Sequence, residues 1–228
     1  MGQYDRLDTK EIRKREIFER YLTHLGLSEQ EIRGATIMDI GASTGAFADV
    51  AMDRGAKMVV SIEATRPGNR SDQTKGGNIK LFDTSAEDEN LEEKLAGTDA
   101  EDKDFDYILA HASFLYTDFV ENQDVSGKWT KEIDFLGLQQ KAIQVLCYHL
   151  GKLKKDGGKM IIFPYFPSQA ILNFKGNIKD VSEYNHLIYV AIQQALTDYP
   201  KLKFHIEEVK NEGGVKYYRI IFESNLDR

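Results

Sequence analysis

The chain has 228 residues, 41% of them hydrophobic and 29% charged, a composition typical of one globular domain with a sizeable core. Its apolar runs are far shorter than the roughly 20 residues of a membrane span, and its first residues lack the apolar stretch of a signal peptide. The single cysteine excludes an internal disulfide and favours the reducing cytoplasm, and the net charge of −7 disfavours a sequence-independent grip on nucleic acid.

Residues 1 to 34 are expected to form a helical segment in front of the core of this domain. An amphipathic helix is predicted over residues 10 to 25, and Gly26 is expected to end it. The apolar face of this helix carries Phe18, Leu22 and Leu25. Ser28 and Glu31 have the spacing of a capping box, which predicts a further short helical turn.

The core, residues 35 to 228, alternates predicted strands with predicted helices. Strands are expected at 36–40, 57–62, 79–82, 105–110, 159–163, 203–209 and 215–223, with a polar loop at 66–77. Helices are expected from Phe47 to Gly55 and at 139–153 and 183–198. This order predicts an α/β fold with a mostly parallel sheet covered on both faces and a C-terminal antiparallel hairpin.

Two stretches do not fit any regular element, residues 113 to 134 and residues 163 to 180. Both follow the carboxyl end of a predicted strand, which is where open α/β sheets bind their ligands. We therefore interpret them as loops that grip a substrate.

The clearest functional signal is the glycine-rich turn between the first strand and its helix. Gly41 and Gly45 allow a sharp turn and a close approach to a ligand, because neither has a Cβ atom. Asp39 ends the strand before the turn and can bind an ammonium group, while the free N–H groups that open the helix suit polar ligand atoms. Glu63 ends the next strand, where two acceptor oxygens match a ribose diol.

The spacing of Asp39, Gly41, Gly45 and Glu63 resembles the first two motifs of class I S-adenosylmethionine-dependent methyltransferases. The resemblance implies a Rossmann-like, doubly wound, seven-stranded sheet, with S-adenosylmethionine as the cofactor. It implies that Asp39 and the glycine turn hold the methionine part and that Glu63 holds the ribose hydroxyls. The implied cofactor-binding residues are Asp39, Gly41, Ala42, Ser43, Thr44, Gly45, Glu63, Ala64, Ser85, Ala86 and His111.

Within this class, the segment from Asp39 to Phe47 is most similar to the hemolysin-like, FtsJ-related ribosomal RNA methyltransferases. Those enzymes use a Lys-Asp-Lys-Glu tetrad, from which this chain departs. His111 occupies the position of the aspartate, no lysine follows the fifth strand, and Tyr217 or Tyr218 stands where the glutamate belongs. If RNA is bound, the basic side chains available for it are Lys57, Arg66, Arg70, Lys75 and Lys80.

Methyl transfer from a sulfonium is an in-line displacement, so a base is needed only where the nucleophile has a proton to lose. His111, at the end of the fourth predicted strand, is the candidate base or substrate orienter, and Tyr165 is a second candidate catalytic residue. An aromatic wall for the substrate is predicted from Tyr116, Trp129, Tyr165 and Phe166. The other histidines have no metal-ligand spacing and are assigned structural roles, so no metal site is expected.

We therefore expect methyl transfer to an oxygen, nitrogen or carbon atom of a small-molecule acceptor. One alternative is an RNA methyltransferase of the FtsJ-related type. Another is a non-catalytic protein that keeps the cofactor pocket as a sensor or scaffold. A nicotinamide-dependent dehydrogenase is disfavoured, because the Gly-x-Gly-x-x-Gly fingerprint lacks its second glycine at Ser43.

Overall fold

The computed structural model describes residues 9–64, 71–84, 91–111, 135–165, 192–210 and 216–224. The helices are α1 (Thr9–Leu25), α2 (Glu29–Ile32), α3 (Ala46–Asp53), α4 (Leu91–Leu95) and α6 (Phe135–Gly151), and residues 192–198 are also helical. The strands are β1 (Thr36–Ile40), β2 (Met58–Glu63), β3 (Gln73–Lys75), β4 (Asn78–Phe82), β5 (Tyr107–His111), β6 (Lys159–Tyr165), β7 (Leu202–Lys210) and β8 (Lys216–Ser224). Within these ranges, no helix combines the length and the apolar character that crossing a membrane requires.

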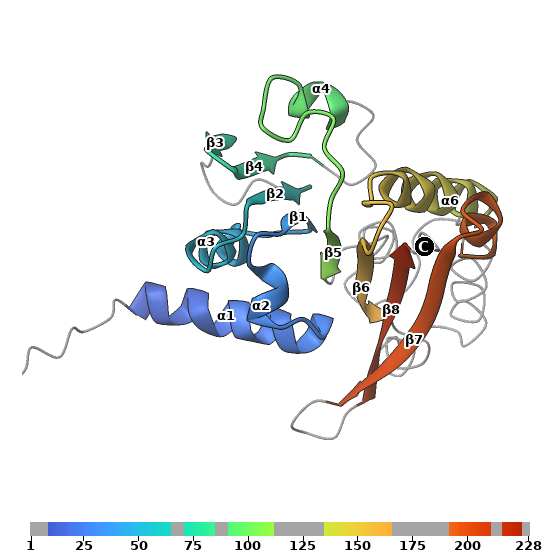
Figure 1. Cartoon of the computed structure of the whole chain (residues 1–228), viewed down its shortest axis with the longest axis horizontal. Helices are drawn as coiled ribbons and strands as arrows, with labels where there is room; N and C mark the ends of the chain where they lie inside the picture. Colours follow the sequence, from blue (N-terminus) through green and yellow to red (C-terminus); the bar gives the residue numbers. More distant parts are fainter. Residues whose placement is uncertain are drawn as a thin grey trace, which may run out of the picture.

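The strands form one sheet in the order β3-β4-β2-β1-β5-β6-β8-β7 (Figure 1). Strands β4, β2, β1, β5 and β6 run parallel, and β8 runs antiparallel to both β6 and β7. The chain starts in the middle at β1, moves outward through β2, and later returns to β5 on the other side of β1. The predicted doubly wound sheet with a C-terminal hairpin is confirmed, and its winding reverses between β1 and β5, the place where such sheets bind ligands.

The sheet has one strand more than the sequence predicts. Residues Gln73 to Lys75, inside the expected polar loop, pair antiparallel with β4 and form the edge strand β3. All three residues are exposed, so they carry none of the apolar alternation by which a strand is recognised. Their pairing depends on the tight turn at Gly76 and Gly77 and on the neighbouring strand.

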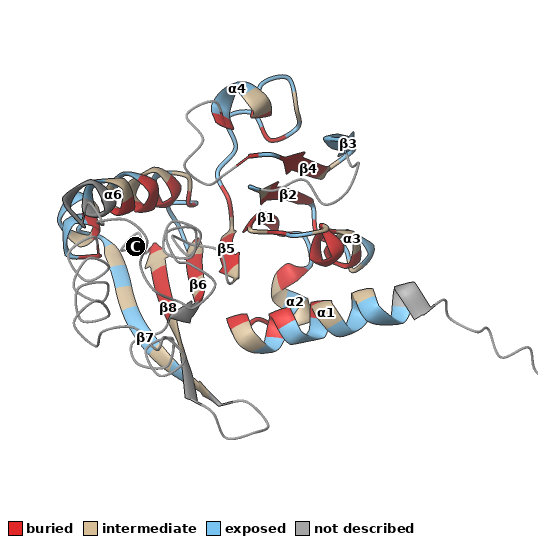
Figure 2. Ribbon diagram, turned by 180° about the vertical axis from the view of Figure 1, so that it is seen from behind, coloured by how far each residue is buried: buried red, intermediate tan, exposed pale blue. Residues whose placement is uncertain are grey.

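Helices cover both faces of the sheet, and each face has its own apolar core (Figure 2). Helices α1 and α3 pack on one face, and α4 and α6 pack on the other. Side chains alternate along β1, so Ile37 contributes to the core beneath α1 and α3, while Met38 and Ile40 face the opposite core. Asp39 therefore points to the same side as Ile37, beneath α1 and α3.

The N-terminal helices have the predicted ends. Helix α1 stops at Gly26, whose φ of 67° is the left-handed conformation that glycine adopts at helix C-termini. The capping box of α2 is formed, because the Ser28 hydroxyl accepts the Glu31 N–H and the Glu31 carboxylate accepts the Ser28 N–H. Helix α1 packs beside α3 on the same face of the sheet.

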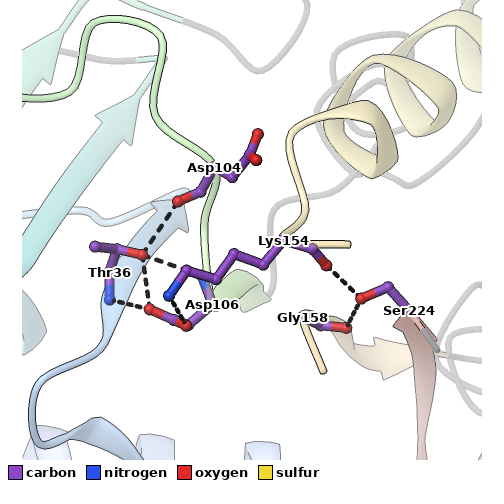
Figure 3. A network of polar contacts seen from close by, with 6 residues as sticks. All are labelled: Thr36, Asp104, Asp106, Lys154, Gly158 and Ser224. Carbon is purple, nitrogen blue, oxygen red and sulfur yellow. Dashed lines mark hydrogen bonds and ion pairs between the residues drawn. The ribbon is translucent and has the colours of Figure 1, made fainter. Parts of the chain in front are cut away.

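A polar network ties the strands together at the end of the sheet opposite the glycine turn (Figure 3). The Asp106 carboxylate, just before β5, accepts hydrogen bonds from the Thr36 N–H at 2.7 Å and the Thr36 hydroxyl at 2.8 Å. Lys154 forms an ion pair with the same carboxylate at 2.5 Å. The Ser224 hydroxyl, at the end of β8, donates to the carbonyl groups of Lys154 and Gly158. These contacts fix the amino ends of β1, β5 and β6.

Candidate functional site

The glycine turn after β1 is held against the end of β2. The N–H groups of Gly41 and Ala42 both donate to the Ile62 carbonyl, at 2.8 and 3.1 Å. Gly41, Ser43 and Gly45 have φ values of 75°, 53° and 70°, all in the left-handed region. Three left-handed residues within five positions make a compact turn, which explains why glycine is required at its two ends.

Asp39, near the end of the strand before this turn, has a buried carboxyl group that makes no hydrogen bond to the described residues. Its exposed fraction is 0%, and neither carboxyl oxygen has a hydrogen-bond partner in the described part of the chain. Ser61, the register partner of Asp39 on β2, has a buried hydroxyl that likewise finds no hydrogen-bond partner in the described ranges. Burial, followed by the nearby charge of Glu63, raises the pKa of Asp39 to about 7. Such unsatisfied groups are costly, and they indicate a place where a polar ligand binds.

Glu63 joins the end of β2 to the turn. Its carboxylate accepts a hydrogen bond from the Ser43 N–H at 2.6 Å. The predicted acid of the second strand and the predicted glycine turn therefore meet, as the sequence motif requires. Ala64 follows Glu63 and is exposed, and the Thr84 N–H donates to the Glu63 carbonyl at 2.9 Å, which brings the end of β4 alongside.

Behind the turn, Lys80 of β4 braces the start of α3. A Cβ atom on Gly45 would lie 2.9 Å from Cδ and from Cε of Lys80, so the lysine stem fills the space next to this glycine. The Lys80 ammonium pairs with Asp49, which Lys14 also contacts at 3.3 Å. Lys80 is 6% exposed, so its inclusion in a basic RNA-binding surface is wrong. Its neighbours in sequence gave no sign of this burial, because the covering helix is contributed by a different part of the chain.

His111 ends β5 and lies under α1 in a stack of rings. Its ring packs on Tyr21 with centroids 4.1 Å apart, and Tyr21 in turn packs on Phe47 at 5.1 Å. The ring of Phe163 on β6 also stacks with His111, with centroids 5.5 Å apart. Burial is the largest cause that raises the pKa of Tyr21, and Asp39 is the next, which places this stack close to the buried carboxyl group.

His24, which sequence reasoning assigned a structural role, forms part of this site. Its Nδ1 lies 3.0 Å from Nε2 of His111. Burial, then the neighbouring His24, then Arg20 lower the pKa of His111 to about 4, so this imidazole is neutral at pH 7. His24 follows Tyr21 by three residues on α1, a spacing that puts both side chains on one face of the helix. In the sequence, this spacing is the signal that could have placed His24 beside Tyr21 in the site.

Several predicted site residues lie outside the described residues. These are Ser85, Ala86, Tyr116, Trp129 and Phe166, together with most of the two predicted substrate loops. Tyr165 ends β6, and its backbone pairs with Tyr218 of β8. The side chains of Tyr165 and Tyr217 are not among those described. Their predicted roles stay predictions.

The arrangement offers two acidic side chains, Asp39 and Glu63, beside the glycine turn, and a pair of neutral imidazoles at the end of β5. A buried carboxylate is a strong acceptor for an ammonium group, and a half-buried one for a pair of hydroxyls. No side chain caps α3 at Gly45, so the N–H groups at its start face the turn. The geometry suits a ligand that combines an amino acid with a ribose.

Comparisons with known proteins agree with this geometry. The model of the family described as FtsJ-like methyltransferase matches residues 15–187. No curated protein matches the chain. Among solved structures, a Listeria monocytogenes protein assigned as an S-adenosylmethionine-dependent methyltransferase has 12% identity and a TM-score of 0.51, over 94% of this chain and 98% of its own.

Two further structures have lower scores. A Streptococcus thermophilus protein assigned as a hemolysin has 15% identity and a TM-score of 0.49, over 99% of this chain and 70% of its own. The O-methyltransferase from Bacillus cereus has 12% identity and a TM-score of 0.48, over 96% of this chain and 93% of its own. At these identities, the structural likeness concerns the fold alone, and it is the Listeria monocytogenes protein that supports the doubly wound α/β architecture.

Proposed function

This chain belongs to the FtsJ-like methyltransferase family, and on that premise we propose that it transfers a methyl group from S-adenosylmethionine to an oxygen, nitrogen or carbon atom of a small-molecule acceptor. The observation that carries the proposal is the buried Asp39 carboxyl group, whose two oxygens have no partner among the described residues. It lies next to a glycine turn whose backbone is bonded to Glu63.

The residues present fit this cofactor. The Asp39 carboxylate would take the ammonium group of the methionine part, which supplies the charge partner that the buried acid lacks. The turn from Gly41 to Gly45 would hold the rest of that part with its backbone, and Glu63 would accept from the ribose hydroxyls. When bound, the cofactor supplies a methyl group on a positively charged sulfur, which is activated toward nucleophiles.

The role of the chain in the reaction is alignment. Because the displacement is in line, holding the acceptor atom opposite the sulfur provides much of the rate. His111 stands at the end of β5 and contributes to the orientation of the acceptor. A pKa of about 4 makes its imidazole a weak base at neutral pH, which favours an orienting role over proton abstraction from a resting acceptor.

The rings around His111 favour a small acceptor. Among the described residues, the rings of Tyr21, His24 and Phe163 pack against it, and the charge of Arg20 also acts on it. The chain as a whole carries a net charge of −7, which opposes a polyanionic substrate.

We expect His111→Phe to slow methyl transfer while cofactor affinity stays within about twofold. Phenylalanine keeps the ring stack but removes both nitrogens, so a loss of roughly 10²-fold or more is expected if the imidazole acts on the acceptor. The measurement is transfer of labelled methyl from S-adenosylmethionine to a panel of small molecules. If no acceptor is ever labelled although the cofactor binds, the protein is a cofactor-binding protein without transfer activity.

An RNA acceptor is the second candidate, favoured by the family match over residues 15–187. Lys57 and Lys75 are exposed and available to phosphates, whereas Lys80 is not. If the acceptor is a small molecule, filter binding to ribosomal RNA over a salt series should show no salt-dependent affinity. A steep decrease in affinity with added salt, reduced by Lys57→Gln and Lys75→Gln, would instead favour RNA.

A further inference from the structure

Two imidazoles from distant parts of the chain share one hydrogen bond. The ring planes of His24 on α1 and His111 on β5 are parallel within 3°, and Nδ1 of His24 lies 3.0 Å from Nε2 of His111. Both rings are neutral, because burial and the charge of Arg20 lower the pKa of each. In such a pair, one nitrogen carries the proton and the other presents a lone pair.

The surroundings of His111 decide which nitrogen donates. The ring of His111 also bonds to its own backbone, and this bond raises its pKa, as a bond donated by the ring does. Nε2 faces His24, so the nitrogen that reaches the backbone is Nδ1, which carries the proton. Nε2 of His111 then presents its lone pair, and Nδ1 of His24 must donate. The remaining nitrogen of His24, Nε2, is left with a lone pair and makes no hydrogen bond within the described residues.

Contacts from the C-terminal hairpin hold His24 in place. The guanidinium of Arg219, on β8, donates to the His24 carbonyl at 3.3 Å and bonds to Glu207 on β7 at 2.6 Å. It packs against Gly26, where a Cβ atom would lie 2.1 Å from it, so only glycine leaves room. The His24 ring itself packs on Phe163 with centroids 4.6 Å apart. The end of α1 is therefore clamped to the sheet beside β5 and β6.

We propose that His24 is the imidazole that faces the methyl acceptor, through Nε2, and that His111 is the positioning residue that sets its tautomer. This assignment rests on the proposed function, because methyl transfer to a hydroxyl or an amine releases the proton that the lone pair of His24 would receive. It extends the interpretation of His111, which then acts on the acceptor through His24.

The lone pair suits the chemistry despite the low basicity of the ring. As the acceptor atom forms its bond to the methyl carbon, the bond from that carbon to sulfur breaks, and a hydroxyl or amine acceptor becomes far more acidic. Its proton then passes to Nε2 of His24. The imidazolium that forms keeps its Nδ1–H bond to the lone pair of His111, which stabilises it as the orienting partner does in a catalytic triad.

The first test is the tautomer of each ring, measured by long-range proton–nitrogen correlation on the full chain labelled with ¹⁵N-histidine. We expect both His24 and His111 to carry their proton on Nδ1, although a free neutral imidazole favours Nε2. His205 on β7, whose Nε2 lies 3.1 Å from a carboxylate oxygen of Glu207 and donates to it, serves as the internal reference for a ring with its proton on Nε2. Detection of His24 with its proton on Nε2 would overturn the proposal, whatever the cofactor does.

The second test asks whether His24 contacts the methyl acceptor itself or only holds His111 in place. In His24→Asn, the side-chain amide can still donate to Nε2 of His111 but offers nothing at the position of Nε2 of His24. We expect this variant to keep the His111 tautomer and S-adenosylhomocysteine affinity and to lose roughly 10²-fold in methyl transfer. Wild-type turnover in His24→Asn would show that His24 only supports His111. Failure of the wild type to bind S-adenosylhomocysteine in calorimetry would instead refute the proposed function.

Discussion

Gly41→Val should abolish binding of S-adenosylmethionine and of S-adenosylhomocysteine. Gly41 has a φ of 75°, a conformation that a β-branched residue adopts only with strain, and its Cβ would enter the turn that meets the ligand. The blocked approach predicts a loss of at least about a hundredfold in affinity, while the strain of about 1–2 kcal/mol lowers the stability of the fold. Isothermal calorimetry on the full chain measures it.

Gly34→Val is the matched control for this variant. Gly34 has almost the same φ, 76°, lies before β1 at the far end of the strand, and has open space where a Cβ atom would be added. We expect the same strain to lower the melting temperature in both variants, while Gly34→Val keeps wild-type affinity for the ligand. Equal affinities in the two variants would refute the assignment of the turn.

Asp39→Asn is expected to stabilise the ligand-free protein while it weakens cofactor binding. An amide removes the buried charge at neutral pH, but it cannot pair with an ammonium group. Because hydrogen bonds to charged groups contribute about 1.5–3 kcal/mol, the loss of affinity should be about ten- to a hundredfold. A gain in stability joined to a loss of binding is the behaviour of a residue kept for its ligand. Urea unfolding and calorimetry measure the two effects.

The raised pKa of Asp39 determines how the stability of the fold changes with pH. The pKa is about 7 in the folded chain and 3.8 as the ordinary value, so the unfolded chain ionises first. The contribution of Asp39 to the free energy of unfolding of the wild type is fully present below pH 4. It is lost as the pH rises to 7, at about 1.4 kcal/mol per pH unit. The advantage of Asp39→Asn should therefore be greatest above pH 7 and vanish near pH 4. An advantage that does not change over this range would contradict the burial of an ionisable Asp39.

Cofactor binding should also release a proton from Asp39 at pH 6, since an ammonium partner favours the carboxylate. Calorimetry in buffers of different ionisation enthalpy would detect this release in the wild type and not in Asp39→Asn.

Asp106→Asn is the control for charge removal itself. Hydrogen bonds from Lys154 and Thr36 outweigh partial burial and lower the pKa of Asp106, so its carboxylate stabilises the fold. Replacing it should cost about 1–3 kcal/mol, because one hydrogen-bond partner is lost inside the network of Figure 3. Cofactor affinity should remain that of the wild type, since this network lies at the opposite end of the sheet. The two aspartates thus give opposite changes in stability.

Much of the fold could be predicted because its elements are local in sequence. The strands from Thr36 and from Met58 are continuous apolar runs, which buried parallel strands require, and their ends at the glycine turn and at Glu63 lie where predicted. The edge strand β3 was missed because three exposed residues carry no apolar pattern. Its formation depends on the turn at Gly76 and Gly77 and on the partner strand β4.

By itself, the sequence determined the winding of the sheet and the glycine turn with its two acids, because strand periodicity and left-handed glycines act over a few residues. Only the tertiary structure decided that Lys80 is buried behind that turn, that Asp39 has no partner among the described residues, and that His24 meets His111 across 87 positions of the chain. These properties arise where α1 and α3 pack on one face of the sheet. Burial and pairing are set by neighbours in space, which no local pattern specifies.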